Sequence, residues 1–148
     1  MDPLEFFQKG EILLGGFNVG PDVATRWDKF GREEEIAKMT NRVDGIGFER
    51  RIFSPDGLKI FTGVEVNDKN ILSTYELLIL PAAYYMMFEI NCNDDIDRQF
   101  DEMDKWIDKN KNKYKRVKWE NSDDDYIIIW SGRYPSEMIC EIWVPIVK

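Results

Sequence analysis

A glutamate and a tryptophan near the C-terminus are the two side chains best placed to do chemistry. Residues 138–147 are strongly apolar and predict a β-strand, in which side chains alternate between two faces. Glu141 and Trp143 are two positions apart, so they share one face and place a carboxylate beside an indole. Burying a lone carboxylate is costly unless a cation or hydrogen-bond donors compensate its charge. The pair therefore predicts a site that attracts positive charge.

The composition agrees with such a site and excludes several classes of protein. The chain has 148 residues with 20 Lys and Arg, 28 Asp and Glu and no His, which gives a formal charge of −8. The lack of imidazole excludes nucleophilic catalysis with a histidine base and zinc sites that contain histidine. Direct binding to nucleic acid or to an anionic membrane needs clustered basic residues, so the acidic balance of the chain argues against both partners. Cationic ligands are the partners that this acidic chain favours instead.

We expect neither a cofactor nor a metal ion. The spacing of Asn91, Asn93, Asp95 and Glu102 is similar to that of a calcium loop, but Ile96 stands where that loop requires glycine. There is no P-loop and no glycine-rich dinucleotide motif.

The N-terminus and the cysteine content predict a cytoplasmic protein without a membrane segment. The first residues lack the basic and apolar regions of a signal peptide. The longest uncharged apolar run, residues 77–88, is interrupted by Pro81 and is shorter than the roughly 20 residues needed to span a bilayer. Two cysteines are too few for a disulfide framework, and a reducing compartment is the default for such a chain.

The elements that must position the site occur twice in the same order. Residues 11–19 predict a strand, residues 21–37 a helix, and residues 46–53 and 58–66 a β-hairpin across a turn that contains Pro55 and Gly57. Residues 75–90 then predict strand structure around Pro81, and Ile96, Phe100, Met103 and Ile107 mark an amphipathic helix. Residues 126–130 and 138–147 predict two final strands.

This order predicts an α+β fold built from a duplicated β-α-β-β module. We expect a single domain over residues 1–148, with a first module at about 11–66 and a second at about 75–147. Two such halves can pair their strands and leave a cleft between them, where small ligands usually bind.

Four stretches of the chain resemble the effector-binding, or gyrase-inhibitor-like, domain family of AraC/XylS-type and MerR-type multidrug regulators. They read WDKF at 27–30, FTGVEV at 61–66, LPAAYYMMFE at 80–89 and CEIWVPI at 140–146. The resemblance implies an antiparallel sheet with two main helices, a pseudo-two-fold axis and a central pocket. Because only about ten residues precede the first expected strand, the chain resembles a stand-alone form, of the kind also found on mobile integron gene cassettes.

The resemblance also implies a role for particular residues. Members of the family bind lipophilic, often cationic compounds between aromatic walls and a buried glutamate, which by position would be Glu141. The candidate ligand-binding residues are Glu141, Trp27, Trp143, Glu65, Tyr85, Phe48 and Phe61. For Glu141 the alternative is a carboxylate that faces solvent or pairs with a Lys or Arg of the chain. The aromatic candidates are alternatively ordinary core residues.

Four functions are compatible with these residues. The first is a stand-alone protein that senses or sequesters lipophilic cations, without enzymatic activity. The second is a small-molecule hydrolase that uses Glu141 as general acid or base. The third is a protein inhibitor of a DNA enzyme, as the family name suggests, and the fourth is a sensor subunit that joins a separate DNA-binding regulator.

Overall fold

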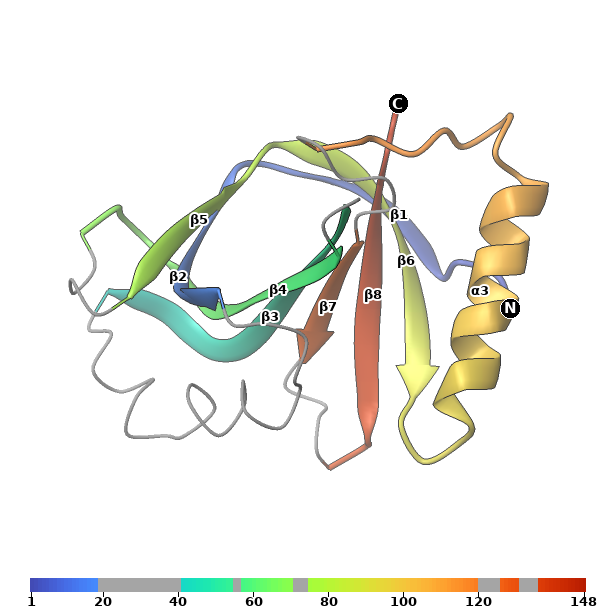
Figure 1. The fold of residues 1–148 in the computed structure, drawn as a ribbon, viewed down its shortest axis with the longest axis horizontal. Helices are drawn as coiled ribbons and strands as arrows, with labels where there is room; N and C mark the ends of the chain where they lie inside the picture. Colours follow the sequence, from blue (N-terminus) through green and yellow to red (C-terminus); the bar gives the residue numbers. More distant parts are fainter. Residues whose placement is uncertain (19–40, 55–56, 71–74, 120–125, 131–135) are drawn as a thin grey trace.

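The computed structural model describes residues 1–18, 41–54, 57–70, 75–119, 126–130 and 136–148, and the statements below concern these residues. They form one antiparallel sheet of eight strands and one helix, which is an α+β fold (Figure 1). The elements are β1 (Glu5–Lys9), β2 (Ile12–Asn18), β3 (Arg42–Ser54), β4 (Gly57–Val66), β5 (Glu76–Leu80), β6 (Ala83–Asn91), α3 (Ile96–Lys109), β7 (Tyr126–Trp130) and β8 (Ile139–Ile146).

The sheet curls until its two ends approach each other. The strand order is β1-β6-β8-β7-β3-β4-β2-β5, so β5 lies at one end and β6 lies next to the other. Only Pro81 and Ala82 join these two strands. The three Cα–Cα steps from Leu80 to Ala83 span at most roughly 11 Å, so both ends of the sheet meet at this rim. Figure 1 shows the same path from β5 into β6.

The single stretch of strand structure expected for residues 75–90 is in fact two strands with different neighbours. β5 pairs with β2, whereas β6 pairs with β1 and β8. Pro81 lies at the break because a proline has no N–H to donate to a ladder.

The remaining described elements largely follow the sequence pattern. The helix around Met103, the β3–β4 hairpin and the last two strands are confirmed, within one to four residues at their ends. β1 is a correction, because we expected no strand before residue 11. The helix expected at 21–37 lies outside the described residues, so only one of the two expected helices is described.

The described residues form three apolar clusters on the two faces of the sheet, of which the smallest contains Val64, Val66 and Tyr75. The outer face is covered by α3, whose Met103 and Ile107 are buried against β6, β7 and β8. We call the cluster of the opposite face the inner cluster. It takes residues from both ends of the curled sheet, namely Ile12, Leu14, Phe48, Phe61, Leu80, Tyr85, Met87, Trp119, Ile127, Ile129 and Trp143.

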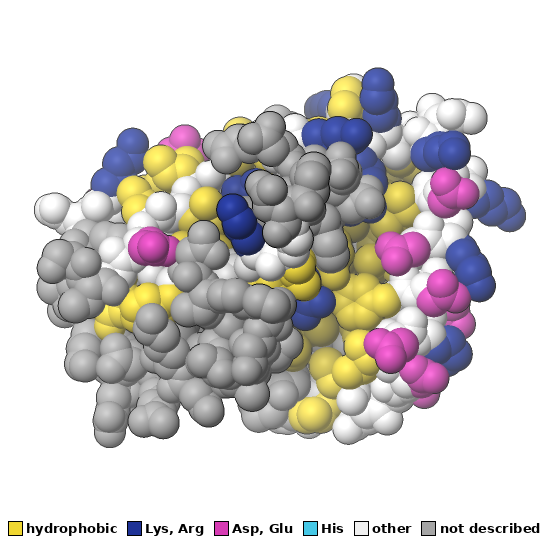
Figure 2. Space-filling model, viewed as in Figure 1, with side chains coloured by type: hydrophobic (Ala, Val, Ile, Leu, Met, Phe, Trp, Pro, Cys, Tyr) yellow, Lys and Arg dark blue, Asp and Glu magenta, His cyan; other side chains and the backbone are white. Residues whose placement is uncertain are grey.

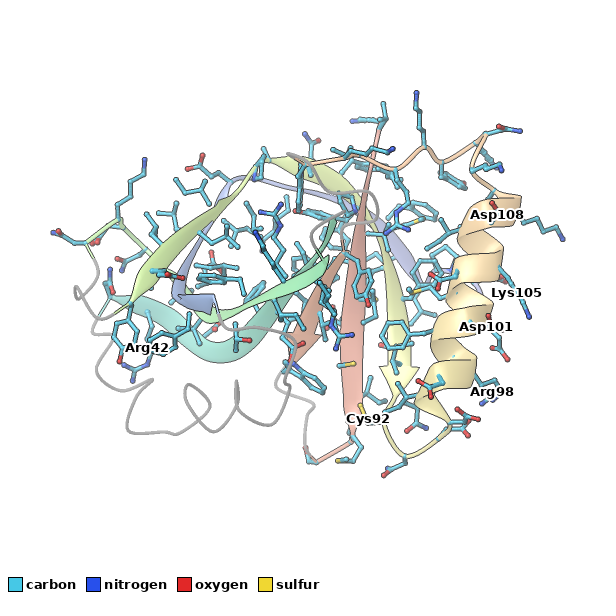
Figure 3. The ribbon with its side chains drawn as sticks, viewed as in Figure 1. Arg42, Cys92, Arg98, Asp101, Lys105 and Asp108 are labelled. Carbon is cyan, nitrogen blue, oxygen red and sulfur yellow. The ribbon has the colours of Figure 1, made fainter. Side chains whose placement is uncertain are left out.

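Helix α3 has one apolar side and one strongly charged side. Its N-cap is Asp95, whose side chain accepts a hydrogen bond from the Arg98 backbone N–H at 3.0 Å. On the outward side Arg98, Asp101, Lys105 and Asp108 point away from the sheet (Figure 3). Figure 2 shows charged side chains of both signs along this side of the molecule. Within the described residues, this helix is not long and apolar enough to cross a membrane.

Two glycines allow β2 and β4 to approach closely. A Cβ built on Gly16 would lie 1.9 Å from the Thr62 carbonyl oxygen, and one on Gly63 would lie 2.5 Å from the Gly15 carbonyl oxygen. Real side chains do not tolerate such contacts with backbone, so both positions require glycine. The glycine of the FTGVEV stretch is thus explained by strand packing.

Candidate functional site

Trp143 lies within a group of aromatic rings on the inner face. Its ring centroid is 4.9 Å from that of Phe7, 5.6 Å from that of Tyr85 and 6.1 Å from that of Phe48. The Phe7 and Phe48 rings meet the indole edge to face, at interplanar angles of 79° and 87°. These separations are typical of favourable aromatic pairs. The rings come from β1, β6, β3 and β8, so the strand order of the whole sheet is needed to assemble them.

Glu141 lies beside this aromatic group and is half-buried. Its Oε1 accepts a hydrogen bond from Trp143 Nε1 at 3.1 Å. Across the strands it faces Ile129 of β7 and Glu89 of β6, which is a second half-buried carboxylate. Among the described residues, no Lys or Arg forms an ion pair with Glu141. The carboxylate thus has a neutral hydrogen-bond donor but no described counter-ion.

The structure brings most of the predicted residues to one face. Phe48, Phe61, Tyr85 and Trp143 are all buried members of the inner cluster. Strand parity separates Tyr85 from Tyr84, which packs with the outer cluster instead. The register therefore places Tyr85, and not Tyr84, on the inner face.

Two further predicted residues are less closely joined to this group. Glu65 is half-buried and lies opposite Leu14, a member of the inner cluster, so it shares the inner face. It lies on β4, three strands away from β8 in the sheet. Trp27 lies outside the described residues.

Arg50 is a buried charge of the inner face that the sequence analysis missed. It is 4% exposed, and its guanidinium carbon lies 5.2 Å from the centroid of the Trp119 ring. It faces Phe61 on one side and Ile127 on the other. Burial raises the pKa of the Tyr85 hydroxyl far above its ordinary value, and the nearby charge of Arg50 acts in the opposite direction. Arg50 and Phe48 are two positions apart on one strand. The two-residue period of a strand could therefore have predicted that Arg50 shares the face of Phe48.

The missed strand β1 adds two more neighbours of Trp143. Phe7 makes the edge contact described above, and the exposed Lys9 places its Nζ 5.8 Å from the centroid of the Trp143 ring. A lysine ammonium over an indole is a favourable cation–π arrangement. One face of the Trp143 ring therefore already interacts with a positive charge of the chain itself.

A second glutamate–tryptophan pair lies on the outer face. Glu49 is fully buried, and its Oε1 accepts a hydrogen bond from Trp130 Nε1 at 3.0 Å. Its Oε2 lies 3.6 Å from Arg51 Nη2. This carboxylate was not among the predicted residues, although the spacing of Glu49 and Arg51 places both on one strand face.

No group of three or more Cys, Asp or Glu side chains suited to a metal ion occurs in the described ranges. The expectation of a site without cofactor or metal stays a prediction.

Comparison with known proteins identifies the fold. The chain is similar to a structure of SAV2435 bound to tetraphenylphosphonium, with a TM-score of 0.72 at 18% identity over 99% of this chain and 94% of the other. It is also similar to a protein from Staphylococcus aureus MU50 provisionally described as a bacterial transcription regulation protein, with a TM-score of 0.68 at 19% identity over 97% of each chain.

A third similar structure is an integron cassette protein from Vibrio cholerae, with a TM-score of 0.56 at 13% identity over 98% of this chain and 96% of the other. The C-terminal domain of EcmrR matches with a TM-score of 0.57 at 16% identity, over 97% of this chain and 96% of that domain. No family model and no curated protein matches the sequence. The chain therefore has the gyrase-inhibitor-like fold that its four short stretches suggested.

Proposed function

We propose that this chain binds lipophilic organic cations on the inner face of its sheet, with Glu141 as the charged group that attracts them. The observation that carries the proposal is a half-buried carboxylate beside an aromatic wall, with an indole N–H but no counter-ion among the described residues. The structural neighbour bound to tetraphenylphosphonium supports this chemistry for the fold.

The interaction energies are sufficient for binding. A cation at about 4 Å from Glu141 gains roughly 4 kcal/mol at an effective dielectric constant of about 20. Each aromatic face adds about 0.5–2 kcal/mol through cation–π attraction. These terms need no hydrogen bond specific to one ligand, so we expect broad specificity for hydrophobic cations.

Arg50 opposes a cation, but its position limits the effect. It lies two strands across and two residues along from Glu141, which is roughly 12 Å from the spacings of a β-sheet. At that distance its repulsion of a cation bound at Glu141 is about 1.4 kcal/mol, less than the attraction by the carboxylate. We infer that the cation lies toward Glu141 and Glu89, while its apolar groups contact the aromatic rings.

The predicted residues provide either charge or apolar surface in this proposal. Glu141 supplies the negative charge, and Trp143, Tyr85, Phe48 and Phe61 supply the apolar wall. Glu65 would be a second, more distant carboxylate of the same face, and Trp27 is retained from the resemblance alone.

We further propose that residues 1–148 form one ligand-binding domain made of two modules, at about 11–66 and 75–147, around a central pocket. The strand order supports this duplication, because β6-β8-β7 on one side of the sheet is followed by β3-β4-β2 on the other. When β5 is left aside, the strands of the second module occur in the order first, third, second, and those of the first module in the reverse order, second, third, first. The description of one structural neighbour as a bacterial transcription regulation protein, and a structure of EcmrR in complex with DNA, support a role as a sensor that acts with a DNA-binding partner.

The experiment is calorimetric titration with two ions of the same shape and opposite charge, tetraphenylphosphonium and tetraphenylborate. We expect the cation to bind and the anion to bind at least tenfold more weakly. Glu141→Gln should weaken the cation by about 5- to 150-fold, which is about 1–3 kcal/mol.

Asp101→Asn is the matched control, because it removes one carboxylate charge on the exposed side of α3, where Asp101 pairs with Lys105 at 2.9 Å. It should leave the affinity unchanged. Equal affinity for both ions, or an unchanged affinity for the cation in Glu141→Gln, would contradict the proposal.

A further inference from the structure

The two cysteines of the chain are neighbours in the structure. Cys92 follows the last residue of β6 and Cys140 is the second residue of β8, with Ile90 facing Cys140 and Asn91 facing Ile139. Figure 3 shows Cys92 at the end of the sheet where β6 leads into α3. Both thiols are free and belong to the packing of the outer cluster.

The backbone fixes the position of Cys92 relative to β8. The Cys92 N–H donates to the Met138 carbonyl oxygen at 2.7 Å, one step beyond the last pair of the ladder. Met138 has a φ of 51°, a left-handed conformation that is uncommon for a residue with a side chain. The two cysteines therefore lie diagonally across the strand pair, on the same face.

Their surroundings give the two thiols different chemistry. Cys140 is 3% exposed, and its pKa is raised well above the ordinary value, chiefly by burial and further by Cys92, with which it shares a hydrogen bond, and by Glu49. Cys92 is half-buried and lies at the turn before α3. A reagent in solution therefore meets Cys92 first, while Cys140 is held as a neutral thiol behind it.

We propose that Cys92 and Cys140 form a reversible intramolecular disulfide when the chain meets a low-molecular-weight disulfide such as oxidised glutathione. The Cys92 thiolate attacks one sulfur of glutathione disulfide and releases a glutathione thiolate, which leaves a mixed disulfide on Cys92. The Cys140 sulfur, on losing its proton, attacks the Cys92 sulfur and releases the second glutathione. Two protein thiols are oxidised and one glutathione disulfide is reduced to two thiols, so the step balances.

The contact between the thiols is the reason to expect this reaction in the folded chain. A disulfide needs its two Cα atoms within about 7 Å, a limit that distant cysteines cannot meet without backbone movement. Here the side chains are diagonal neighbours on the same face of a strand pair, and such neighbours ordinarily have Cα atoms about 7–8 Å apart. Closing the bond therefore requires the sulfurs to approach and the strand end at Cys92 to shift slightly. The bond would join β6 to β8 one residue before Glu141.

The test equilibrates the full chain in glutathione buffers of different ratios, followed by acid quenching. We expect a single species that is 2 Da lighter, has no reactive thiol and gives a peptide linking Cys92 to Cys140. The effective concentration of the thiol pair should be at least tenfold higher in buffer than in 8 M urea. Cys92→Ser should give no species of lower mass and instead a glutathione adduct on Cys140 or no product.

Three results would overturn the proposal. One is a pair that stays reduced even in a large excess of oxidised glutathione over reduced glutathione. A second is disulfide formation only between chains, seen as a dimer whose yield rises with protein concentration. The third is an effective concentration in buffer that is equal to or below that in urea, which would mean that the fold does not favour the bond.

Discussion

Two glutamates of the described residues accept a hydrogen bond from an indole, and their surroundings differ. Glu49 on the outer face is fully buried and has Arg51 at 3.6 Å in addition to Trp130. Glu141 on the inner face is half-buried and has Trp143 as its described hydrogen-bond partner. Among the described residues, the first carboxylate has a positive charge at 3.6 Å, whereas the second forms no ion pair.

The difference is visible in the sequence two positions after each glutamate. A strand brings residues i and i+2 to the same face, so Glu49 is followed on its face by Arg51 and Glu141 by Trp143. An ion pair within the strand makes a carboxylate structural. An indole at that position satisfies one oxygen and leaves the charge in place, which is what a cation site requires.

The largest expected difference between the two pairs is in stability. Glu49→Gln leaves Arg51 without its carboxylate, so the free energy of unfolding should fall by about 1–3 kcal/mol. The lower part of that range is favoured because the Arg51 side chain is 24% exposed and partly solvated. Glu141→Gln should cost less than about 1 kcal/mol, since water reaches its carboxylate. Urea denaturation of the three proteins measures both values.

The two variants change the formal charge by the same amount and replace the same side chain, so each is the control for the other. A larger loss of stability in Glu141→Gln than in Glu49→Gln would reverse the assignment of structural and functional roles.

The parts of the fold that local patterns specify were predictable. The helix around Met103 has a clear apolar face, and the β3–β4 hairpin is marked by the turn residues between two apolar runs. β1 could not be found in this way, because its five residues are too few to show a period and its pairing partner β6 is about 80 residues away. Pro81 indicated a break between residues 75–80 and 83–90. The pairing of β5 with β2, and of β6 with β1 and β8, depends on the curl of the sheet and could not be predicted from the break.

The candidate site was predictable only within one strand. The shared face of Glu141 and Trp143 follows from the two-residue period of a strand. That Phe48 and Tyr85 lie against Trp143 depends on the order of the strands, which no local pattern contains. Arg50 was missed because an arginine between Glu49 and Arg51 is typical of an exposed segment, and its burial follows from the sheet that surrounds it.

A smaller difference should appear in the coupling between each glutamate and its indole. A double-mutant cycle with Glu49→Gln and Trp130→Phe should give a coupling energy of about 1 kcal/mol, and the cycle with Glu141→Gln and Trp143→Phe less than about 0.5 kcal/mol. Each cycle cancels the packing loss that Trp→Phe causes by itself, so the hydrogen bonds at 3.0 and 3.1 Å are compared directly. Equal couplings would mean that burial does not distinguish the pairs.

The smallest expected effect concerns two buried tyrosines, one for each face. Tyr85 on the inner face is fully buried and its hydroxyl has no hydrogen-bond partner among the described residues, whereas the Tyr126 hydroxyl on the outer face accepts from Arg51 Nη1 at 3.5 Å. Removing a buried hydroxyl without a partner removes a desolvation penalty, so Tyr85→Phe should raise the free energy of unfolding by up to about 1 kcal/mol.

Tyr126→Phe is the matched control and should lower the free energy of unfolding by about 0.5–1 kcal/mol, because it removes a hydrogen bond to a charged group. Thermal and urea unfolding of both variants give the two signs. If Tyr85→Phe is the more destabilising of the two, the Tyr85 hydroxyl is part of the packed structure. Opposite signs would instead show that the Tyr85 hydroxyl is an unsatisfied polar group of the inner face, where a bound molecule could reach it.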